Sequence, residues 1–447
     1  MLNKLLDIGK RSIMNQLEAI KVTGQNISNI NTPGYSRQKV ELKSVTSMGN
    51  DSINSLEAQR VRDIFIDQNF RMENHTLGKW DMQTQLYGQI ESIFLEPSEK
   101  SLNNMLSEFW NSWEDLANNP QNSAPRSVVV QNGVLVSQSI NRIESQLRDT
   151  QLLTNRYLED KVTQVNDIAN QIANINKRVV STEASGQEAS EVRDNRDLLL
   201  DQMSSLVDIK VIERETGSMS VYIGGRAIVD DAEAYKIETQ PSTHDPLLSE
   251  MVWSEDKDQV NISSGGIQGL LFMQDQVIPA IQEDIDQVAS TLIDAVNTLH
   301  IGGFDLNGDP GLDFFTGDSA SNIAVNSEIF SDSDKVSASE TGEPGGNGVA
   351  LAIANLSNQE VPAINTDIGT FYSNIVSELG TQSRGASMMR ENAEILMTQL
   401  DEQRQSVSGV SLEEETANLI RYQRAYEAAA SYMSTVDEMM KTIIDMV

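Results

Sequence analysis

The sequence predicts a mainly α-helical fold with an inserted small β domain. Long antiparallel helices or coiled-coil rods form its body, and the N- and C-terminal helices are brought together. Three observations support this fold class: apolar residues recur at seven-residue intervals through most of the chain, one central region alternates in two-residue steps instead, and both ends show the same helical pattern. With 447 residues, the chain has room for about three domains.

The first helix is predicted from an apolar seam near the start of the chain. Its members recur every seventh residue and therefore share one helical face: Leu6, Ile13, Ile20 and Ile27. Residues 1–34 are assigned to a terminal helical coiled-coil domain, together with residues 409–447. We expect this domain to be largely disordered in the free monomer.

The stretch "NISNINTPGY", residues 26–35, ends this first helix. Pro33 disfavours helical geometry at Thr32, and it suits the first central position of a turn whose second central residue is Gly34. We therefore expect a turn over residues 32–35, followed by an extended segment that leads towards the body of the molecule.

Four polar side chains crowd the last turn of this helix, and a simple helix stop does not explain them. Burying such groups is costly unless each finds a hydrogen-bond partner. We interpret them as candidates for hydrogen bonds between subunits: Asn26, Ser28, Asn29 and Asn31.

Further seven-residue seams predict the long helices of a rod, assigned to residues 35–208 and 263–408. They cover residues 102–116, 158–179, 281–299 and 375–407. Ser98 precedes the first of these seams and Pro120 follows it, as is typical of helix boundaries. Core packing is the expected role of every apolar residue in these seams.

A small β domain is predicted for residues 209–262, where the apolar pattern shortens to strand-like runs. Gly224 and Gly225 are the candidate turn of a hairpin within it. Residues 302–348 are rich in Gly, Asp, Ser and Asn, and they are predicted to form a long loop.

The last helix has an unusually broad apolar face. One track consists of Leu412, Leu419, Tyr426, Met433, Met440 and Val447. A second track lies beside it, at Ala429, Tyr432, Val436, Met439 and Ile443. Two adjoining tracks exceed what one partner helix covers, although ordinary bundle packing is the simpler alternative for either end alone.

The net charge of -33 argues against nucleic acid or an anionic membrane as a partner, because phosphate binding requires clustered Lys and Arg. Solubility is the simpler explanation of this acidity. The charge is uneven, however: residues 1–43 carry seven bases against three acids, whereas residues 412–447 carry seven acids against three bases. A basic first segment and an acidic last segment favour pairing of the two ends.

No catalytic or metal-binding constellation stands out. The chain has no cysteine, which excludes disulfides, thiolate catalysis and Cys-type zinc sites. Its histidines, His75, His244 and His300, are too far apart in sequence to suggest shared ligation. No cofactor is expected, and the composition favours an interaction protein over an enzyme.

The stretch "DLNGDPGLD" is the best candidate for an ion site. Asp305, Asn307 and Asp309 resemble the first ligands of a calcium loop. Pro310 takes the place of the required glycine, and Thr316 that of the bidentate glutamate. We therefore predict an Asn-Gly turn here rather than a calcium site.

No apolar run approaches the length of a membrane span. Charged residues interrupt the first 21 residues, so no cleavable secretory signal of the usual kind is expected, and export would need another route.

Both ends resemble the bacterial flagellar axial proteins of the rod, hook and hook-filament junction. The Asn-rich helix end followed by Thr-x-Gly-Tyr is similar to their N-terminal signature, and "SGVSLEEETANLIRYQRAYEAAASYMSTVDEMMKTIIDMV" is similar to their C-terminal segment. The resemblance implies an assembly motif made of Asn26, Ile27, Asn29, Asn31, Thr32, Pro33, Gly34 and Tyr35.

The seam-rich middle favours the FlgK family of first hook-filament junction proteins, because hook and most rod proteins have β-rich bodies. The stretches "VRDNRDLLLDQMSSLVDIKV" and "GGFDLNGDPGLDFF" also resemble this family. Members often carry a second β insertion after the Phe-Phe pair, and here only the predicted loop follows Phe315. We expect that outer domain to be missing.

The resemblance implies a structural protein that polymerises as the hook-filament junction adapter required for filament assembly. The implied partners are further copies of the chain, the hook protein, the second junction protein and a flagellar export chaperone that binds the last helix. The implied route is the flagellar type III apparatus, which leads to an extracellular location without signal cleavage. A hook or second junction protein is the nearest alternative; a secreted hydrolase lacks a visible carboxylate site, and an intracellular coiled-coil scaffold leaves the Asn-rich signature unexplained.

Overall fold

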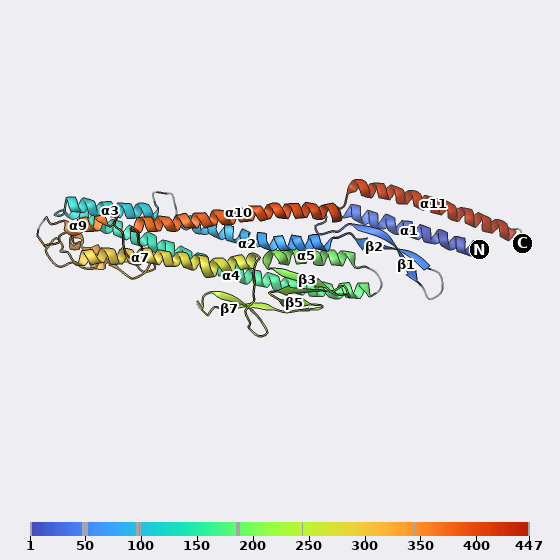
Figure 1. The fold of residues 1–447 in the computed structure, drawn as a ribbon, viewed down its shortest axis with the longest axis horizontal. Helices are drawn as coiled ribbons and strands as arrows, with labels where there is room; N and C mark the ends of the chain where they lie inside the picture. The colour runs from blue at the N-terminus through green and yellow to red at the C-terminus, as the bar shows by residue number, and fades with distance from the viewer. Residues whose placement is uncertain are drawn as a thin grey trace.

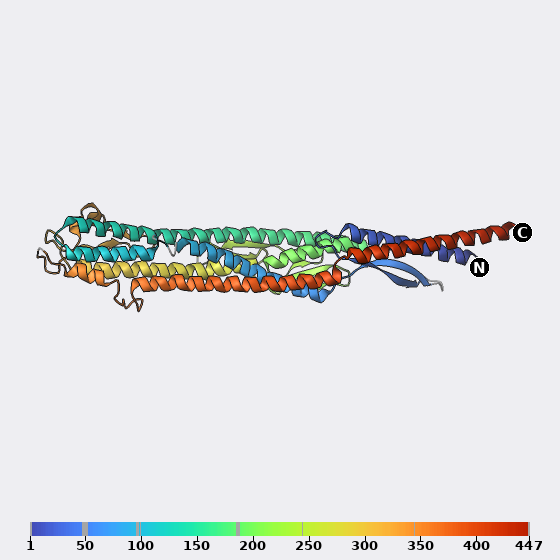
Figure 2. The ribbon, with the colours of Figure 1, turned by 90° about the horizontal axis from the view of Figure 1, so that it is seen from above.

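The computed structural model describes residues 2–46, 52–94, 98, 100–184, 188–243, 245–343 and 345–445. The molecule is a long helical bundle with both chain ends at one tip and a small β domain on its side (Figures 1 and 2). The predicted fold class, mainly α with a β insertion, is confirmed. Two residues named above, Val447 and His244, lie outside the described residues.

Long helices run along the rod and give it its length. They are α2 (Ile64–Phe94), α3 (Leu102–Asn118), α4 (Ser123–Glu183), α5 (Ser190–Leu206), α7 (Ile278–Ile301) and α10 (Ile368–Ser408). Shorter elements complete it: α6 (Gly266–Phe272), the π-helical turn η1 (Met273–Val277) and α9 (Gly348–Asn355). Helix α4 alone has 61 residues, which corresponds to about 90 Å.

The predicted seams form most of the core of this rod. The expectation that every apolar residue of the seams packs in the core is wrong for the last seam, because Met389, Leu396 and Val407 of α10 are 48%, 46% and 37% exposed. In α3, the side chain of Ser101 caps the helix by accepting from the backbone N–H of Asn104. The apolar residues of this seam are all buried: Leu102, Leu106, Phe109, Trp113 and Leu116. Helix α2 was not predicted, and it packs along α10, α5 and α6.

The β insertion packs on one side of α4 (Figure 1). Its strands are β3 (Ile209–Glu213), β4 (Met219–Ile223), β5 (Arg226–Asp230), β6 (Glu233–Ala234), β7 (Ile237–Pro241) and β8 (Ser249–Trp253). The first four form an antiparallel sheet in chain order, and β7 pairs with β8. Gly224 and Gly225 both have positive φ and form the predicted hairpin turn between β4 and β5. Asn176 of α4 donates to the carbonyl of Met219 at 2.7 Å, which ties the sheet to the rod.

Residues 302–348 are not a simple loop, which corrects that prediction. They contain β9 (Phe315–Thr316), β10 (Ala324–Val325), α8 (Ser327–Ser331) and a 3-10 turn, η2 (Ser333–Lys335). Phe314 and Phe315 are buried against Phe109 of α3, with ring centroids 5.8 and 5.7 Å away. The segment therefore closes the far end of the bundle, because its aromatic residues complete the core there.

At the opposite end, α1 (Leu2–Ser28) and α11 (Leu412–Asp445) pack antiparallel and extend beyond the rod (Figures 1 and 2). A hairpin of β1 (Gln38–Thr46) and β2 (Ser52–Arg60) lies beside α1. The rod was predicted to begin at residue 35; this boundary is corrected, because the hairpin packs on the terminal helix and the helical rod begins with α2. Within the described residues, none of the helices is both long and apolar enough to span a membrane.

Candidate assembly site

The predicted turn after α1 is present. The backbone N–H of Tyr35 donates to the carbonyl of Thr32 at 3.2 Å, and Gly34 adopts a φ of +78°. This geometry is that of a turn with Pro33 and Gly34 at its centre, and the positive φ explains the glycine. The turn rests on α5, because a Cβ at Gly34 would lie 3.3 Å from the Cβ of Leu198.

Asn26 is the centre of a hydrogen-bond cluster beneath this turn. Its side chain is 1% exposed, and its Nδ2 donates to the carbonyl of Gln38 at 2.9 Å and to Oε2 of Glu415 at 3.1 Å. Its Oδ1 accepts from the hydroxyl of Tyr35 and from the backbone N–H of Gln38, both at 2.9 Å. The full hydrogen-bonding capacity of this amide is therefore used within one chain.

This arrangement corrects the expectation that Asn26 bonds to a neighbouring subunit. Ser28 and Asn29 also have partners in their own helix, since their side chains donate to the carbonyls of Gly24 and Gln25. Ser28 and Asn31 are both exposed, so these two remain open to solvent, whereas Asn26 does not.

The start of α11 is held in the same cluster by two acidic residues. Arg37 donates to Glu415 at 2.8 Å and to Glu414 at 2.6 Å. Glu415 is 2% exposed, and its carboxylate accepts from both Asn26 and Arg37. These bonds are therefore made inside the junction. Burial, with the charges of Asp194 and Glu415 adding to it, raises the pKa of Tyr35 to about 12, so this phenol stays protonated and donates.

A second polar cluster lies directly behind the first. Its acceptors are Asp67 at the start of α2 and three aspartates on one face of α5: Asp194, Asp197 and Asp201. Its donors come from the end of β2, the following linker, α2 and α10: Arg60, Arg62, Arg71 and Arg404. We call these eight residues the arginine–aspartate cluster.

Asp197 is the hub of the arginine–aspartate cluster. It lies 2.8 Å from Arg60, 3.0 Å from Arg62 and 3.2 Å from Arg71. Burial alone would raise the pKa of Asp197, but the charges of Arg62, Arg60 and Arg71 outweigh it and hold this pKa far below its usual range. The carboxylate is therefore ionised, as the pairing of a buried charge requires.

The predicted apolar tracks meet between α1 and α11. Half-buried members are Leu6, Ile13, Ile20, Leu419, Tyr426, Met433 and Met440, whereas Leu412 is 51% exposed. Gly9 permits the close approach of the helices, since a Cβ there would lie 2.5 Å from the sulfur of Met433. Ala429 and Val436 of the second track are buried in the same contact.

Other large apolar side chains of the two helices remain exposed. They are Ile8, Met14 and Leu17 of α1, Ile30 in the turn that follows it, and Leu412, Ile420, Tyr432 and Met439 of α11. We call these eight residues the exposed apolar set. On α11 the uncovered residues are Leu412 of the first track, Tyr432 and Met439 of the second track, and Ile420, which belongs to neither. The apolar surface is therefore broader than one partner helix covers, as predicted, but it is not the second track as a whole. Such a surface is typical of an interaction site.

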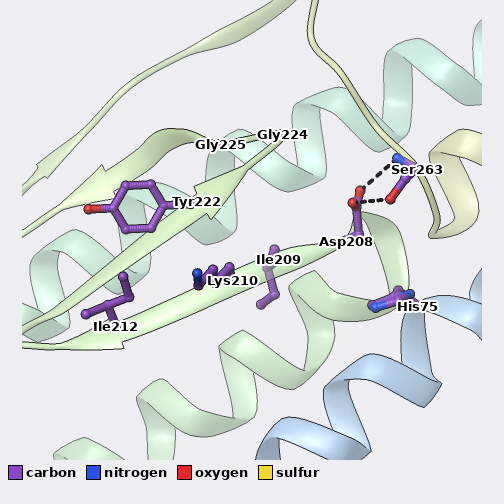
Figure 3. A pocket seen from close by; sticks show the side chains of 9 residues that line it. All are labelled: His75, Asp208, Ile209, Lys210, Ile212, Tyr222, Gly224, Gly225 and Ser263. Atoms are coloured by element: carbon purple, nitrogen blue, oxygen red, sulfur yellow. Dashed lines mark hydrogen bonds between the residues drawn. The ribbon is translucent and has the colours of Figure 1, made fainter.

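A groove of about 600 Å³ lies between the β domain and α2 (Figure 3). Asp208 in it accepts hydrogen bonds from the backbone N–H and the hydroxyl of Ser263 at 3.2 and 2.6 Å. Burial lowers the pKa of His75, and the charge of Asp208 partly opposes this. Because the carboxylate is already occupied, we assign these contacts to the join between the β domain and the rod.

The calcium-like stretch forms a turn. The carboxylate of Asp305 accepts from the backbone N–H groups of Asn307 and Asp309 at 2.8 and 2.9 Å, and Gly308 has a φ of +84°. The ranges that the structure describes contain no group of three or more His, Asp or Glu side chains arranged to hold a metal ion.

The turn "TPGY" and the breadth of the last helix could be predicted, but the arginine–aspartate cluster was missed. Its signal is the spacing of Asp194, Asp197 and Asp201, which places three carboxylates on one face of a helix. The arginines that bind them follow in distant segments, so no local pattern connects the two groups.

Comparison with known proteins relates this chain to flagellar proteins. A model of the flagellar hook-associated protein FlgK helical domain matches residues 87–315, just over half of the 447 residues. A model of the flagellar basal body rod FlgEFG protein C-terminal region matches residues 402–446. This second match includes all of α11 and the end of α10.

Similar proteins cover nearly the whole chain. Flagellar hook-associated protein 1 of Bacillus subtilis (strain 168) is 29% identical, over 98% of this chain and 97% of its own length. The protein of the same name from Salmonella typhimurium is 22% identical, over 96% of this chain and 97% of its own length. That alignment spans 538 positions, more than the 447 residues of this chain, so the relative has stretches that this chain lacks.

A solved structure shares the fold. The flagellar hook junction protein FlgK from Burkholderia pseudomallei superimposes with a TM-score of 0.69 at 14% identity. The superposition covers 76% of this chain and all of that chain.

Proposed function

This chain belongs to the family of the flagellar hook-associated protein FlgK, and on this premise we propose that it polymerises as the hook-filament junction adapter required for filament assembly. Its role is structural and its place is the flagellum, as in the rest of this family. We propose no catalytic step and no cofactor for it.

The observation that carries the proposal is the exposed apolar set on α1 and α11. Ile8, Met14 and Ile420 are 59%, 60% and 59% exposed in the single chain. Burying such a side chain contributes about 1.5–3 kcal/mol, so copies that cover one another's terminal helices gain stability that the isolated chain lacks. A head-to-tail contact of this kind repeats without closing on a pair, which builds a helical array.

The proposed partners follow from this surface. Other copies of the chain cover the terminal helices laterally, the hook protein lies below the array, and the second hook-filament junction protein lies above it. Before assembly, a flagellar export chaperone covers the broad face of α11 (Leu412–Asp445). We also propose that the chain is exported through the flagellar type III apparatus without cleavage of a signal.

The free chain is proposed to order most of α1 and α11 only on assembly, whereas their ends at the rod, which Asn26 and Glu415 join, are ordered from the start. Two helices with uncovered apolar faces gain too little from each other to offset the entropy of ordering both. Opposite net charges of the first and last segments add little, since exposed ion pairs contribute about 0–1 kcal/mol each.

Deletion of the gene tests the proposed role. Cells that lack the protein should carry hooks without filaments and shed flagellin into the medium, and complementation with the unmodified gene should restore filaments. Electron microscopy of the cells and immunoblots of the medium provide the measurement. Filaments of normal number and length in the deletion strain would contradict the proposed role.

Binding of the export chaperone is tested separately. Removal of residues 412–447 should abolish co-purification with the chaperone, whereas removal of the β hairpin at residues 38–60 should leave it unchanged. Retention of the chaperone by the first truncated chain contradicts the assigned chaperone site.

A further inference from the structure

Three connections of the chain lie where the rod meets the terminal part of the molecule (Figure 1), and we call them crossings. The first crossing joins α1 to β1, the second joins β2 to α2, and the third joins α10 to α11. Contacts at these crossings can fix the direction of the terminal helices relative to the rod.

The first crossing is bound to α5. The backbone N–H of Ser36 donates to Oδ2 of Asp194 at 3.1 Å, and the hydroxyl of Ser36 accepts from Arg62 at 3.4 Å. Ser36 is only 2% exposed, so this contact is made inside the junction.

The second crossing carries two of the arginines. Arg60 lies 2.9 Å from Asp194 and 2.8 Å from Asp197. Two guanidinium nitrogens of Arg62 donate to the carboxylate of Asp67, at 2.7 and 2.8 Å, and a third contact joins Arg62 to Asp197 at 3.0 Å. Bidentate contacts of this kind fix the relative orientation of the two side chains as well as their distance.

The third crossing is bound through the end of α10. Arg404 lies 3.0 Å from Asp67 and 2.7 Å from Asp201, and its guanidinium lies over the ring of Phe70 at 4.7 Å. Four residues later, the carbonyl of Ser408 accepts from the backbone N–H of Arg37 at 2.9 Å. The first and third crossings are thus also bonded to each other.

We infer that the arginine–aspartate cluster is a latch that holds all three crossings at once and sets the direction of the terminal helices relative to the rod. Each of its four arginines pairs with at least one of its four aspartates, as a buried charge requires, and Glu188 lies at its edge, 3.9 Å from Arg60. Buried ion pairs add little net stability compared with apolar packing, but they restrict a fold to one geometry because unpaired alternatives are costly. In the free chain the latch fixes the ends of α1 and α11 at the rod, so the two helices take a set direction when neighbouring copies order the rest of them.

Hydrogen exchange of the full-length chain tests the latch. The reporters are the backbone N–H groups of Ser36, Arg37 and Val61, which donate to Asp194, Ser408 and Arg37 respectively. Asp197→Asn removes the central charge and should speed exchange at these amides at least about tenfold, the effect of losing one hydrogen bond to a charged group. Amides of α3, α4 and α7 should exchange at unchanged rates.

A second variant and a control complete the design. Arg404→Gln acts on the third crossing from the edge of the latch and decides the question where Asp197→Asn fails to fold by circular dichroism. Asp245→Asn removes an ion pair between the β domain and Arg148 of α4, at 2.7 Å, and should leave the reporter amides unchanged.

Three outcomes overturn the latch. They are unchanged reporter amides in both variants, faster exchange throughout the rod, and reporter amides that already exchange in the unmodified chain at the rate of an unstructured peptide. None of them depends on filament assembly, so the latch and the proposed function fail or stand separately.

Discussion

Asn26 shows how one side chain joins segments that are far apart in the sequence. It bonds the strand that begins at Gln38 and the helix that contains Glu415, and both contacts are buried. An alanine at this position would leave several buried groups without partners, at a cost of about 1–3 kcal/mol each.

We predict that Asn26→Ala exposes the junction, whereas Asn31→Ala has little effect on the free chain because Asn31 is exposed. Hydrogen exchange at the amide of Gln38, which donates to Asn26, is the measurement. Exchange should rise at least about tenfold in the first variant. Equal rates in the two variants would show that the motif acts only between subunits.

His300 adds a pH dependence at the far end of the rod. Its Nδ1 donates to the carbonyl of Leu312 at 2.5 Å, and its Nε2 accepts from the backbone N–H of Ser337 at 2.8 Å, so the bonded ring is neutral. Burial lowers its pKa from 6.5 to about 4. A protonated ring would present a second donor to Ser337.

The low pKa of His300 makes the folded chain less stable at acidic pH. Between pH 6.5 and 4 the unfolded chain binds a proton at His300 that the folded chain does not, so stability is lost as the pH falls through this window. At about 1.4 kcal/mol per pKa unit, the loss between pH 7 and 4.5 is about 2 kcal/mol. Urea unfolding at both pH values should show a smaller loss in His300→Gln than in the unmodified chain. An identical loss in both would contradict this prediction.

At the scale of elements, the long helices were predictable where their buried faces are apolar. Helix α2 was missed because its buried positions before Leu86 include Asp67, Arg71 and Gln83, which gives no apolar period there. Those charges are tolerable only because α5 and α10 supply partners, a tertiary fact that no local pattern contains.

The β1–β2 hairpin was missed for a different reason. The run "KVELK" alternates apolar and polar residues, and "GND" follows it before the second strand, so a hairpin signal was present. Only the extended first strand was inferred from it. The packed end segment at residues 302–348 was hidden by its loop-like composition, although Phe314 and Phe315 marked its buried part.

The exposed apolar set leads to a prediction about α1 and α11. Leu17→Gln and Ile420→Gln should each weaken association at least about tenfold, because each removes an apolar side chain from the proposed contact between copies. Counting hooks that carry filaments, in a strain that lacks the native gene, measures the effect.

Leu247→Gln is the matched control, since Leu247 is 63% exposed but belongs to the β domain. It should leave filament number unchanged. If all three variants behave alike, then general surface hydrophobicity, and not the terminal helices, accounts for assembly.

At the scale of the whole molecule, order is proposed to differ between the rod and its tip. Trypsin should cut the free chain at Lys21 and Arg421 about tenfold faster than at Lys161 and Lys177 of α4, because locally open segments are cleaved first. Mass spectrometry of a short digestion gives the measurement. Equal protection of these sites would show that the terminal helices are already ordered in the monomer.

The antiparallel pairing of α1 with α11 also has a kinetic consequence. Asn26 and Glu415 are 389 positions apart, so their contact closes almost the entire chain into one loop. Closing a loop of this length costs more entropy than any local contact in α4 or the β domain, and contacts of such high sequence separation form slowly. The two helices should therefore be the last elements to fold, so that the rod reaches its final shape before its tip becomes able to join a growing structure.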